Sequence, residues 1–297
     1  MRANRTLTVA VAYATSGRRD VLSDMVRALE AQTRQPEKVL IAPAAPGDVD
    51  EGAIASLALD CVILPGPAGL TAQRNTLLRA AAGFDLIVYF DDDFLPAPDY
   101  LEKCVTAFET LYDMVVMTGE VLRDGAHSPG VTLEEAKAVI ADDRPVLAKA
   151  PRPTYNAYGC NMVIRADIAR THGLEFDEAL PLYGWFEDVD FSRRMSAFGK
   201  VLQVPACRGV HLATKRGKGS GVKLGYAQIV NPCYLARKGS LAVGRAGAQI
   251  VRNVLANLVH SLRPEPWIDR RGRLWGNLLA LRDLMLGRAD PRHILSL

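Results

Sequence analysis

The sequence of 297 residues contains little cysteine and no long apolar run. Its five cysteines are odd in number and show no Cys-x-x-Cys spacing, which argues against a disulfide framework and against a zinc site. No stretch approaches the roughly 18 consecutive apolar residues that span a bilayer. The N-terminal residues also lack the apolar core of a signal peptide. We therefore expect a cytoplasmic protein.

Glycine-rich nucleotide-binding motifs are absent as well. Without a G-x-G-x-x-G motif, a Rossmann dehydrogenase or methyltransferase is disfavoured. A sugar nucleotidyltransferase needs a glycine-rich loop after its first strand, where residues 14–19 offer only Gly17; it stays the alternative enzyme. Helix-turn-helix and base-stacking patterns are not evident, so we expect no nucleic acid partner. A non-catalytic nucleotide- or nucleic-acid-binding protein is the alternative outside enzymes.

Charge is distributed unevenly along the chain. Residues 1–213 hold 21 Lys and Arg against 29 Asp and Glu, a net charge of −8, whereas residues 214–297 hold 15 against 4, a net charge of +11. A basic C-terminal segment on an acidic body suggests an anionic partner for that segment. We therefore place a boundary at residue 213, between an α/β region and a basic loop followed by amphipathic helices.

Strand and helix patterns alternate through the first part of the chain. This order predicts a largely parallel sheet flanked by helices, with the loops that follow the strands gathered at one edge. Residues 14–19 and 91–93 are then expected to converge. Strands are predicted at residues 7–14, 38–42, 61–64, 84–91, 114–121, 161–164 and 201–204, and helices at 20–32, 49–57, 70–82, 98–112, 132–141, 166–172 and 187–198. Residues 123–130 are predicted to form a loop, and three more helices are predicted at 226–238, 244–262 and 274–286.

The most informative segment is an apolar strand that ends in three carboxylates, Asp91, Asp92 and Asp93. Ligands of open α/β sheets bind beyond the carboxyl ends of the strands. Adjacent carboxylates repel one another unless a cation or hydrogen-bond donors compensate them. The first interpretation of the three aspartates is therefore a site for a divalent cation that also contacts phosphate oxygens. The alternative interpretation is an acidic turn exposed to solvent.

Further motifs follow the aspartates in a fixed order, and together they resemble the inverting glycosyltransferases of family 2, which have the GT-A fold. The resemblance covers about residues 7–213. Its motifs are Gln73-Arg74-Asn75, Asp91-Asp92-Asp93, Gly159-Cys160-Asn161-Met162 with Arg165, Trp185-Phe186-Glu187-Asp188-Val189-Asp190 with Arg193-Arg194, and His211.

The resemblance implies a metal-dependent transfer of a sugar from a nucleotide-sugar to a hydroxyl of a glycan or lipid-linked oligosaccharide. Asp91, Asp93 and His211 are the implied ligands of Mn²⁺ or Mg²⁺, and a histidine ligand favours Mn²⁺; a packed histidine is the alternative for His211. Asp188 is the implied general base. The implied nucleotide contacts are Ala14, Ser16, Arg18, Arg74, Asp91 and Asp92, and the implied substrate contacts are Gly159, Asn161, Trp185 and Glu187.

Several roles stay open at this stage. Asp190 is either functional or a carboxylate that complements the first turn of its helix. Trp185 and Tyr183 either form a sugar platform or pack in the core, and the basic residues 215–223 form either a lid or a linker. Pro43-Ala44-Ala45-Pro46 replaces the family's aspartate-bearing segment that contacts the base, so UDP is expected on family frequency alone.

The C-terminal helices pair apolar positions with arginines, a composition that suits an anionic membrane surface. Family members of this shape often extend lipid-linked oligosaccharides in bacterial polysaccharide assembly, which implies a peripheral position at the inner face of the cell membrane. The alternative is that these helices pack on the α/β region.

Overall fold

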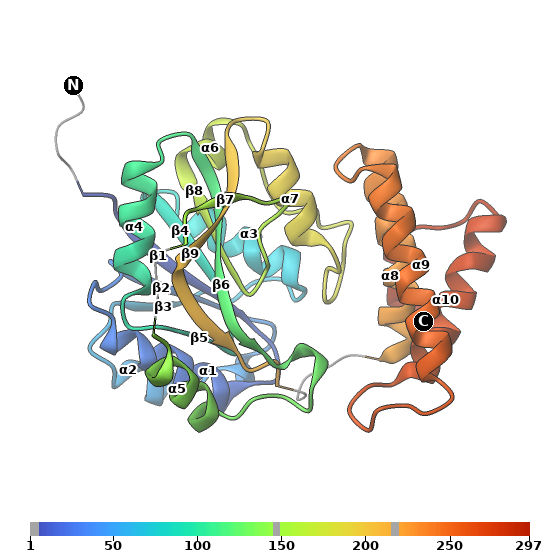
Figure 1. Ribbon diagram of the computed structural model, residues 1–297, viewed down its shortest axis with the longest axis horizontal. Helices are drawn as coiled ribbons and strands as arrows, with labels where there is room; N and C mark the ends of the chain where they lie inside the picture. Colours follow the sequence, from blue (N-terminus) through green and yellow to red (C-terminus); the bar gives the residue numbers. More distant parts are fainter. Residues whose placement is uncertain (1–5, 145–148, 215–219) are drawn as a thin grey trace.

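The computed structural model describes residues 6–144, 149–214 and 220–297. Figure 1 shows a sheet flanked by helices, formed by the residues up to 214 (the N-terminal region), beside a group of helices formed by residues 220–297 (the tail). The strands are β1 Val9–Thr15, β2 Lys38–Pro43, β3 Cys61–Ile63, β4 Leu86–Asp91, β5 Phe94–Pro96, β6 Met114–Asp124, β7 Arg152–Pro153, β8 Asn161–Arg165 and β9 Lys200–His211. The α-helices are α1 Arg19–Ala28, α2 Glu51–Ala55, α3 Leu70–Ala80, α4 Tyr100–Thr110, α5 Leu133–Asp142, α6 Ala166–Thr171, α7 Glu187–Met195, α8 Gly221–Lys238, α9 Val243–His260 and α10 Arg270–Met285.

The predicted α/β class and the largely parallel sheet are confirmed. The strand order is β3-β2-β1-β4-β8-β6-β9-β5, with β7 paired to β9. Strands β3, β2, β1 and β4 are mutually parallel, and β8 runs antiparallel between β4 and β6. The carboxyl ends of β1, β2 and β4 therefore meet at one edge, where Ala14 of β1 is in register with Asp91 of β4.

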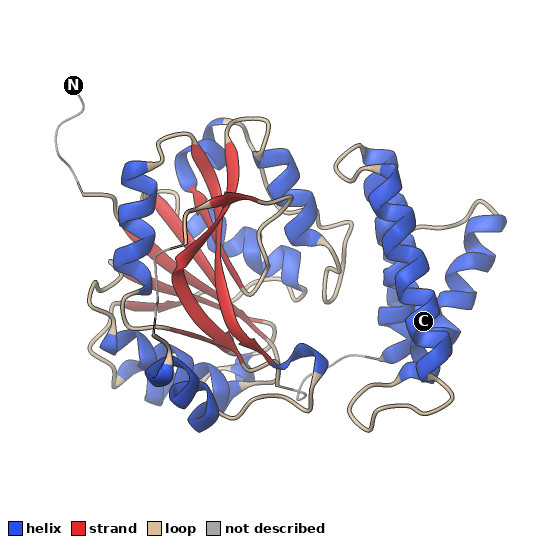
Figure 2. Ribbon diagram, viewed as in Figure 1, coloured by secondary structure: helices blue, strands red, loops and turns tan. Residues whose placement is uncertain are grey.

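Burial on both faces explains the apolar runs of the central strands. Every residue from Val9 to Tyr13 is inaccessible to solvent, because helices cover the sheet on both sides (Figure 2). Helix α1 turns Leu22, Met25 and Val26 to the sheet. The helix predicted over residues 20–32 is shorter in the structure. The α-helix ends at Ala28, and a single 3-10 turn follows it up to Ala31.

Strand β9 is much longer than the predicted strand over 201–204. It pairs in parallel with β6 from Lys200 to His211, and its last residues, from Gly209 to His211, also pair in antiparallel with the short strand β5, which the sequence did not predict. The predicted loop over 123–130 is wrong at its start, because β6 extends to Asp124 and pairs there with His211. Because β5 places Phe94 opposite His211, Asp93 lies beside this histidine.

All three predicted tail helices are present, and α8 and α10 pack closely. A Cβ at Gly225 would lie 2.0 Å from the backbone oxygen of Arg273, and one at Gly276 would lie 2.0 Å from that of Val222. Only glycine permits this approach. None of the helices in the described ranges is long and apolar enough to span a membrane.

Helix α8 also joins the tail to the N-terminal region. Lys238 forms ion pairs with Asp177 and Asp190 at 2.6 and 2.9 Å. The Asn231 side-chain amide donates a hydrogen bond of 2.9 Å to the backbone oxygen of Trp185. Of the predicted basic segment 215–223, residues 215–219 lie outside the described residues, and the rest begins α8 instead of continuing a loop.

Candidate active site

The side chains of Asp91, Asp93 and His211 come together at the carboxyl edge of the sheet. One potential ligand atom from each lies within 4.8 Å of the others. The Nε2 atom of His211 is 3.4 Å from Asp93 Oδ1 and 4.0 Å from Asp91 Oδ2. Asp93 and His211 are buried, and Asp91 is partly exposed at the end of β4. The three residues therefore form one oxygen- and nitrogen-donor cluster that opens to solvent on the Asp91 side.

Two observations show that this cluster fits a divalent cation. Asp93 Oδ1 is buried; it lies 3.4 Å from His211 Nε2 but forms no well-aligned hydrogen bond among the described residues, which leaves this oxygen able to bind a metal. Asp124 Oδ1 lies 2.9 Å from Nδ1 of His211 and thereby orients the ring so that Nε2 faces Asp91 and Asp93. A carboxylate behind a histidine ligand is the usual support of a metal site. The donor set suits Mn²⁺ better than Mg²⁺ because it includes imidazole.

The carboxylates also set the protonation of His211 when no cation is bound. Burial by itself lowers the pKa of His211, but the hydrogen bond to Asp124, the contact with Asp93 and the negative charges of Asp93 and Asp91 outweigh it and raise this pKa to about 10. Burial likewise raises the pKa of Asp124, but the hydrogen bond with His211 prevails and lowers it to about 2. The histidine thus carries the compensating charge in the free protein, and a cation would displace its proton.

Asp124 was missed by the sequence analysis. It lies 33 residues beyond Asp91 in the chain, at the start of a segment predicted as a loop. Only the register of β6 on β9 brings it to His211. Tyr158, also missed, donates a hydrogen bond of 3.1 Å from its hydroxyl to Asp124 Oδ2. Neither residue belongs to a local sequence motif, so their place in the site could be recognised only from the structure.

Asp92 points away from the metal-ligand cluster, toward the end of β1. Its carboxylate accepts a hydrogen bond of 2.6 Å from the Thr15 hydroxyl and forms an ion pair of 2.7 Å with Arg18. Arg18 also reaches Asp93 Oδ2 at 2.8 Å. The expected convergence of residues 14–19 with the aspartates is therefore present, and Arg18 supplies part of the charge compensation. Ala14 is half-buried and Ser16 is exposed at the same edge.

Arg74 is a buried cation that ties three predicted motifs together. Its guanidinium contacts Glu187 Oε1 at 2.8 Å, Asp91 Oδ1 at 3.2 Å and the backbone oxygen of Gly159 at 2.8 Å. Arg74 is only 2% exposed, so these partners are needed to offset the cost of burying its charge. Helix α3, the strand end at Asp91 and the start of α7 are thereby fixed relative to one another.

Asp188 lies in the first turn of α7 and is held by two backbone N–H groups. Gly159 donates to its Oδ2 at 3.0 Å, and Val189 donates to its Oδ1 at 2.8 Å. Burial raises the pKa of Asp188 to about 6, although the charge of Arg74 and these two N–H groups act in the opposite direction. A half-buried carboxylate with a pKa near neutrality is suited to accept a proton.

The remaining predicted residues occupy different surroundings. Asn161 is fully buried in β8, where its Oδ1 accepts a hydrogen bond of 2.6 Å from Thr118, and it does not line the pocket described below. Trp185 does line that pocket, and it also stacks on Phe186 and packs against tail residues. Asp190 lies in the first turn of α7, where it is fully buried and pairs with Arg194 and Lys238.

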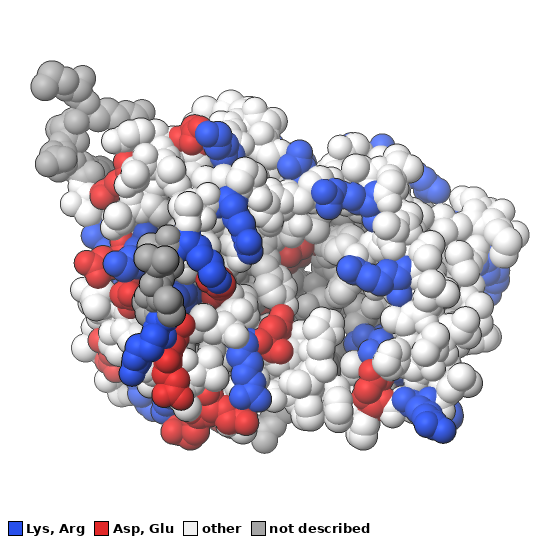
Figure 3. Space-filling model, in the orientation of Figure 1, with Lys and Arg blue, Asp and Glu red and all other residues white. Residues whose placement is uncertain are grey.

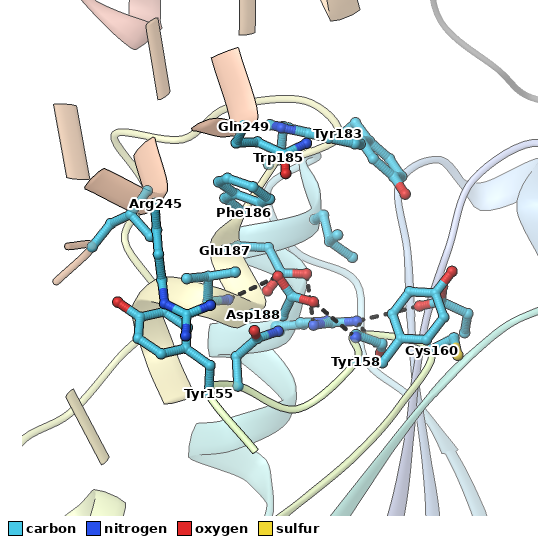
Figure 4. Close-up of a pocket in the computed structure, with 18 of the residues that line it drawn as sticks. Tyr155, Tyr158, Cys160, Tyr183, Trp185, Phe186, Glu187, Asp188, Arg245 and Gln249 are labelled. Carbon is cyan, nitrogen blue, oxygen red and sulfur yellow. Dashed lines mark hydrogen bonds and ion pairs between the residues drawn. The ribbon is translucent and has the colours of Figure 1, made fainter. Parts of the chain in front are cut away.

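A pocket of about 570 Å³ connects these groups. Figure 4 shows Glu187 and Asp188 between Tyr158 and Cys160 on one side and Tyr155 and Arg245 on the other. Asp91 and His211 line the pocket as well, together with residues of α9 that the sequence analysis did not assign to the site. The metal-ligand cluster and Asp188 thus open into one space, which is closed on one side by the tail.

The turn before α7 has an unusual backbone. Leu182 and Phe186 have φ angles of 59° and 74°, and Gly184 between them has a φ of 60°. Left-handed conformations of residues other than glycine cost free energy and gather at functional sites. The turn brings Trp185 to the pocket and starts α7 with Glu187 and Asp188 facing inward.

We expect Gly184→Ala to destabilise the protein by about 1–3 kcal/mol, because alanine disfavours this φ and its Cβ would be crowded. That Cβ would lie 3.2 Å from Glu187 Cγ and from Thr71 Cγ2. Gly173→Ala is the matched control, since Gly173 has a φ of 58° and nothing within 4 Å of its Cβ position. Urea unfolding of both variants measures the difference. Equal loss of stability would show that crowding at Gly184 is unimportant.

Comparison with known proteins identifies the N-terminal region. The family model for glycosyl transferase family 2 matches residues 11–173. No curated protein matches this sequence.

Solved structures share the fold at low sequence identity. S. aureus TarS 1–349 matches with a TM-score of 0.56 and 13% identity, over 97% of this chain and 82% of that chain. The mannosyltransferase PcManGT from Pyrobaculum calidifontis, in complex with GDP-Man and Mn²⁺, matches with a TM-score of 0.55 and 14% identity, over 98% and 86%. GalNAc-T7 with UDP, GalNAc and Mn²⁺ matches with a TM-score of 0.56 and 14% identity, over 95% and 57%. The chain spans 59% and 40% of the chains in two further TarS structures. The similarities to TarS 1–349, PcManGT and GalNAc-T7 show the GT-A fold.

Proposed function

The chain belongs to glycosyl transferase family 2, and we propose that it transfers a sugar from a nucleotide-sugar to an acceptor hydroxyl with inversion at the anomeric carbon. The observation that carries this proposal is the shared pocket of Asp188 and the metal-ligand cluster. A carboxylate able to accept a proton therefore faces the place where a diphosphate would be held. We assign residues 1–213 to the catalytic unit and residues 214–297 to an accessory tail.

Asp188 is the proposed general base. Its carboxylate takes the proton of the acceptor hydroxyl while the hydroxyl oxygen forms a bond to the anomeric carbon. The bond between this carbon and the diphosphate oxygen breaks in the same step, and the nucleoside diphosphate leaves with the electron pair. The N–H groups of Gly159 and Val189 hold the carboxylate in place for this transfer. Attack from the face opposite the leaving group gives inversion.

Asp91, Asp93 and His211 would hold the divalent cation, supported by Asp124. A cation bound there supplies charge stabilisation for the leaving diphosphate. Arg74 places Asp91 and Glu187 at fixed positions beside it. Asn161 is proposed to shape the site from the core, because its side chain bonds to Thr118 and lies behind the pocket wall.

UDP is the proposed nucleotide, with the base and ribose at the edge formed by Ala14, Ser16, Arg18 and Asp92. TarS was solved in complex with UDP and PcManGT with GDP-Man, so GDP is the second candidate. Asp92 keeps its hydrogen bond with Thr15 and its ion pair with Arg18 at this edge. Release of nucleoside diphosphate from UDP- and GDP-sugars in the presence of Mn²⁺ tests the function. Release that continues unchanged in EDTA would argue against the cation's role.

A membrane surface is the proposed location of the acceptor, which we infer to be a glycan or a lipid-linked oligosaccharide. Helix α9 and the turn after it expose an apolar stripe at helical spacing, with Val251 57%, Leu255 54%, Leu258 51%, Val259 63% and Leu262 81% exposed. Helix α10 exposes Trp275, Leu278 and Met285 in the same manner. Arginines Arg263, Arg271 and Arg282 are exposed on these helices and the turn between them, a combination that suits anionic lipid.

We expect the protein to float with liposomes that contain anionic lipid and to remain at the bottom of the gradient with neutral ones. Each arginine near an anionic surface contributes about 1 kcal/mol. A Leu258→Glu, Leu262→Glu variant should lose flotation, since both side chains would enter the lipid. Absence of the wild type from both floated fractions would exclude this location.

A further inference from the structure

Helix α9 has three distinct faces along its length. Ala246, Ile250, Val254 and Asn257 pack against the rest of the tail or the N-terminal region. The apolar stripe from Val251 to Leu262 is exposed. The third face, which carries Arg245, Ala248, Gln249 and Arg252, lines the pocket that also holds Asp188. At about 3.6 residues per turn these four residues lie on one side of the helix. The arginine side of α9 therefore forms part of the catalytic pocket itself.

The two walls of the pocket differ in charge. The wall made by the N-terminal region carries Asp91, Glu187 and Asp188, with Arg74 paired to the first two, whereas the wall made by α9 carries Arg245 and Arg252. In Figure 3, Lys and Arg side chains of the tail border the hollow between the two parts of the molecule. The contacts given for Arg245, Arg193 and Arg252 within the described residues are with Tyr155 and Gln249, and none of them is an ion pair with a carboxylate. These guanidinium groups are therefore available to an external anion.

Tyr155 holds Arg245 in position. The guanidinium carbon of Arg245 lies 4.1 Å from the centre of the Tyr155 ring, and that of Arg193 lies 4.6 Å from it. The Tyr155 hydroxyl accepts a hydrogen bond of 3.1 Å from the backbone N–H of Ala242, the residue before α9. A guanidinium stacked on an aromatic face keeps its N–H edge free for a phosphate or carboxylate. Arg252 donates to Gln249 Oε1, which restrains the second guanidinium.

We propose that this face of α9 is the subsite for a negatively charged acceptor, a proposal that rests on the proposed function. The acceptor carries a phosphate or a carboxylate close to the hydroxyl that is glycosylated. The donor diphosphate belongs at the metal-ligand cluster, and Asp188 must face the acceptor hydroxyl. Arg245 lies on the side of Asp188 away from Tyr158 and Cys160 (Figure 4). An anion bound by Arg245 and Arg252 would therefore be part of the acceptor and would fix the orientation of its hydroxyl.

Three sugars that differ at one carbon test the proposal: glucose, glucose 6-phosphate and glucuronic acid. Binding is measured by saturation-transfer NMR on the full-length protein in EDTA, so that no cation contributes. We expect both charged sugars, or one of them, to bind about tenfold more tightly than glucose, a preference typical of charge-assisted hydrogen bonds. The phosphate and carboxylate arms identify which anion is preferred. The preference should weaken at high salt.

The double variant Arg245→Ala, Arg252→Ala should lose this preference, whereas Arg271→Ala, an exposed arginine outside the pocket, should keep it. The proposal would be overturned if the charged sugars bound no better than glucose, or if none of the three sugars bound.

Binding of UDP with Mn²⁺ is measured on the same samples and should be unchanged in the double variant. Its loss there would assign the arginines to the donor and also overturn the subsite. Absence of UDP and GDP binding in the wild type would instead refute the proposed function.

Discussion

The Asp188→Asn variant is expected to transfer sugar about 10²–10⁴-fold more slowly than the wild type, the range typical of losing a positioned base. The amide has nearly the shape of the carboxylate but cannot accept the acceptor's proton. Asp188 lines the pocket and does not belong to the metal-ligand cluster. Binding of nucleoside diphosphate with Mn²⁺ should therefore remain at the wild-type level. Single-turnover transfer and calorimetry on the same preparation measure the two quantities.

Asp190→Asn is the control for this variant, because Asp190 is two residues away on the same helix. Asp190 is fully buried against Arg194 and Lys238, so its replacement should lower the free energy of unfolding more than Asp188→Asn does. A loss of nucleotide affinity in Asp188→Asn, or a transfer rate close to that of the wild type, would contradict the assignment of the base.

The pH profile gives a second readout of the same residue. Burial raises the pKa of Asp188 to about 6. Because the base acts in its deprotonated form, the wild-type rate should fall by about tenfold per pH unit as the pH drops below about 6. The residual rate of Asp188→Asn should lack this acidic limb. An acidic limb that persists in the variant would assign the titration to another group.

The Asp93→Ala variant is expected to lose most of its affinity for Mn²⁺, more than the ~10–100-fold that accompanies removal of a supporting residue. Asp93 is 1% exposed, and its buried Oδ1 forms no well-aligned hydrogen bond among the described residues. Electron paramagnetic resonance of free Mn²⁺ during titration measures the affinity without any nucleotide present.

Asp124→Asn is the matched comparison for the metal site. The amide can still lie beside His211, but it no longer accepts the hydrogen bond with the strength of a carboxylate. We expect a loss of affinity of about 10–100-fold, smaller than that of Asp93→Ala. Unchanged Mn²⁺ affinity in Asp93→Ala, with the secondary structure intact by circular dichroism, would show that the cation binds elsewhere.

The sequence predicted those parts of the protein that short-range pattern determines. Apolar runs placed β1 and β4 correctly, because both are buried on two faces of a parallel sheet. The position of the aspartates after such a run predicted that they face the ligand edge. The family motifs implied a nucleotide contact for Arg74 and substrate contacts for Gly159 and Glu187, and the structure places these three residues in direct contact through the Arg74 guanidinium.

The features that the sequence did not predict depend on strand register and packing between distant segments, which local sequence patterns do not reveal. Strand β5 has three residues, too few for a periodic signal, yet its pairing with β9 puts Asp93 beside His211. Asp124 reaches His211 only through the irregular pairing of β6 and β9. The arginines of α9 have the spacing of any amphipathic helix, and only the packing of the tail turns Arg245 and Arg252 to the pocket. Asn161 has a recognisable motif position but a buried side chain.

Calorimetric titration of UDP and of GDP into the full-length protein, first with Mn²⁺ and then with EDTA, tests the central claim most directly. We predict that one of the two nucleotides binds in Mn²⁺ and that its binding is lost in EDTA, because Asp91, Asp93 and His211 hold the cation that contacts the diphosphate. Binding that is equally strong in EDTA, or no binding of either nucleotide under any condition, would contradict a metal-dependent nucleotide-sugar site in this pocket.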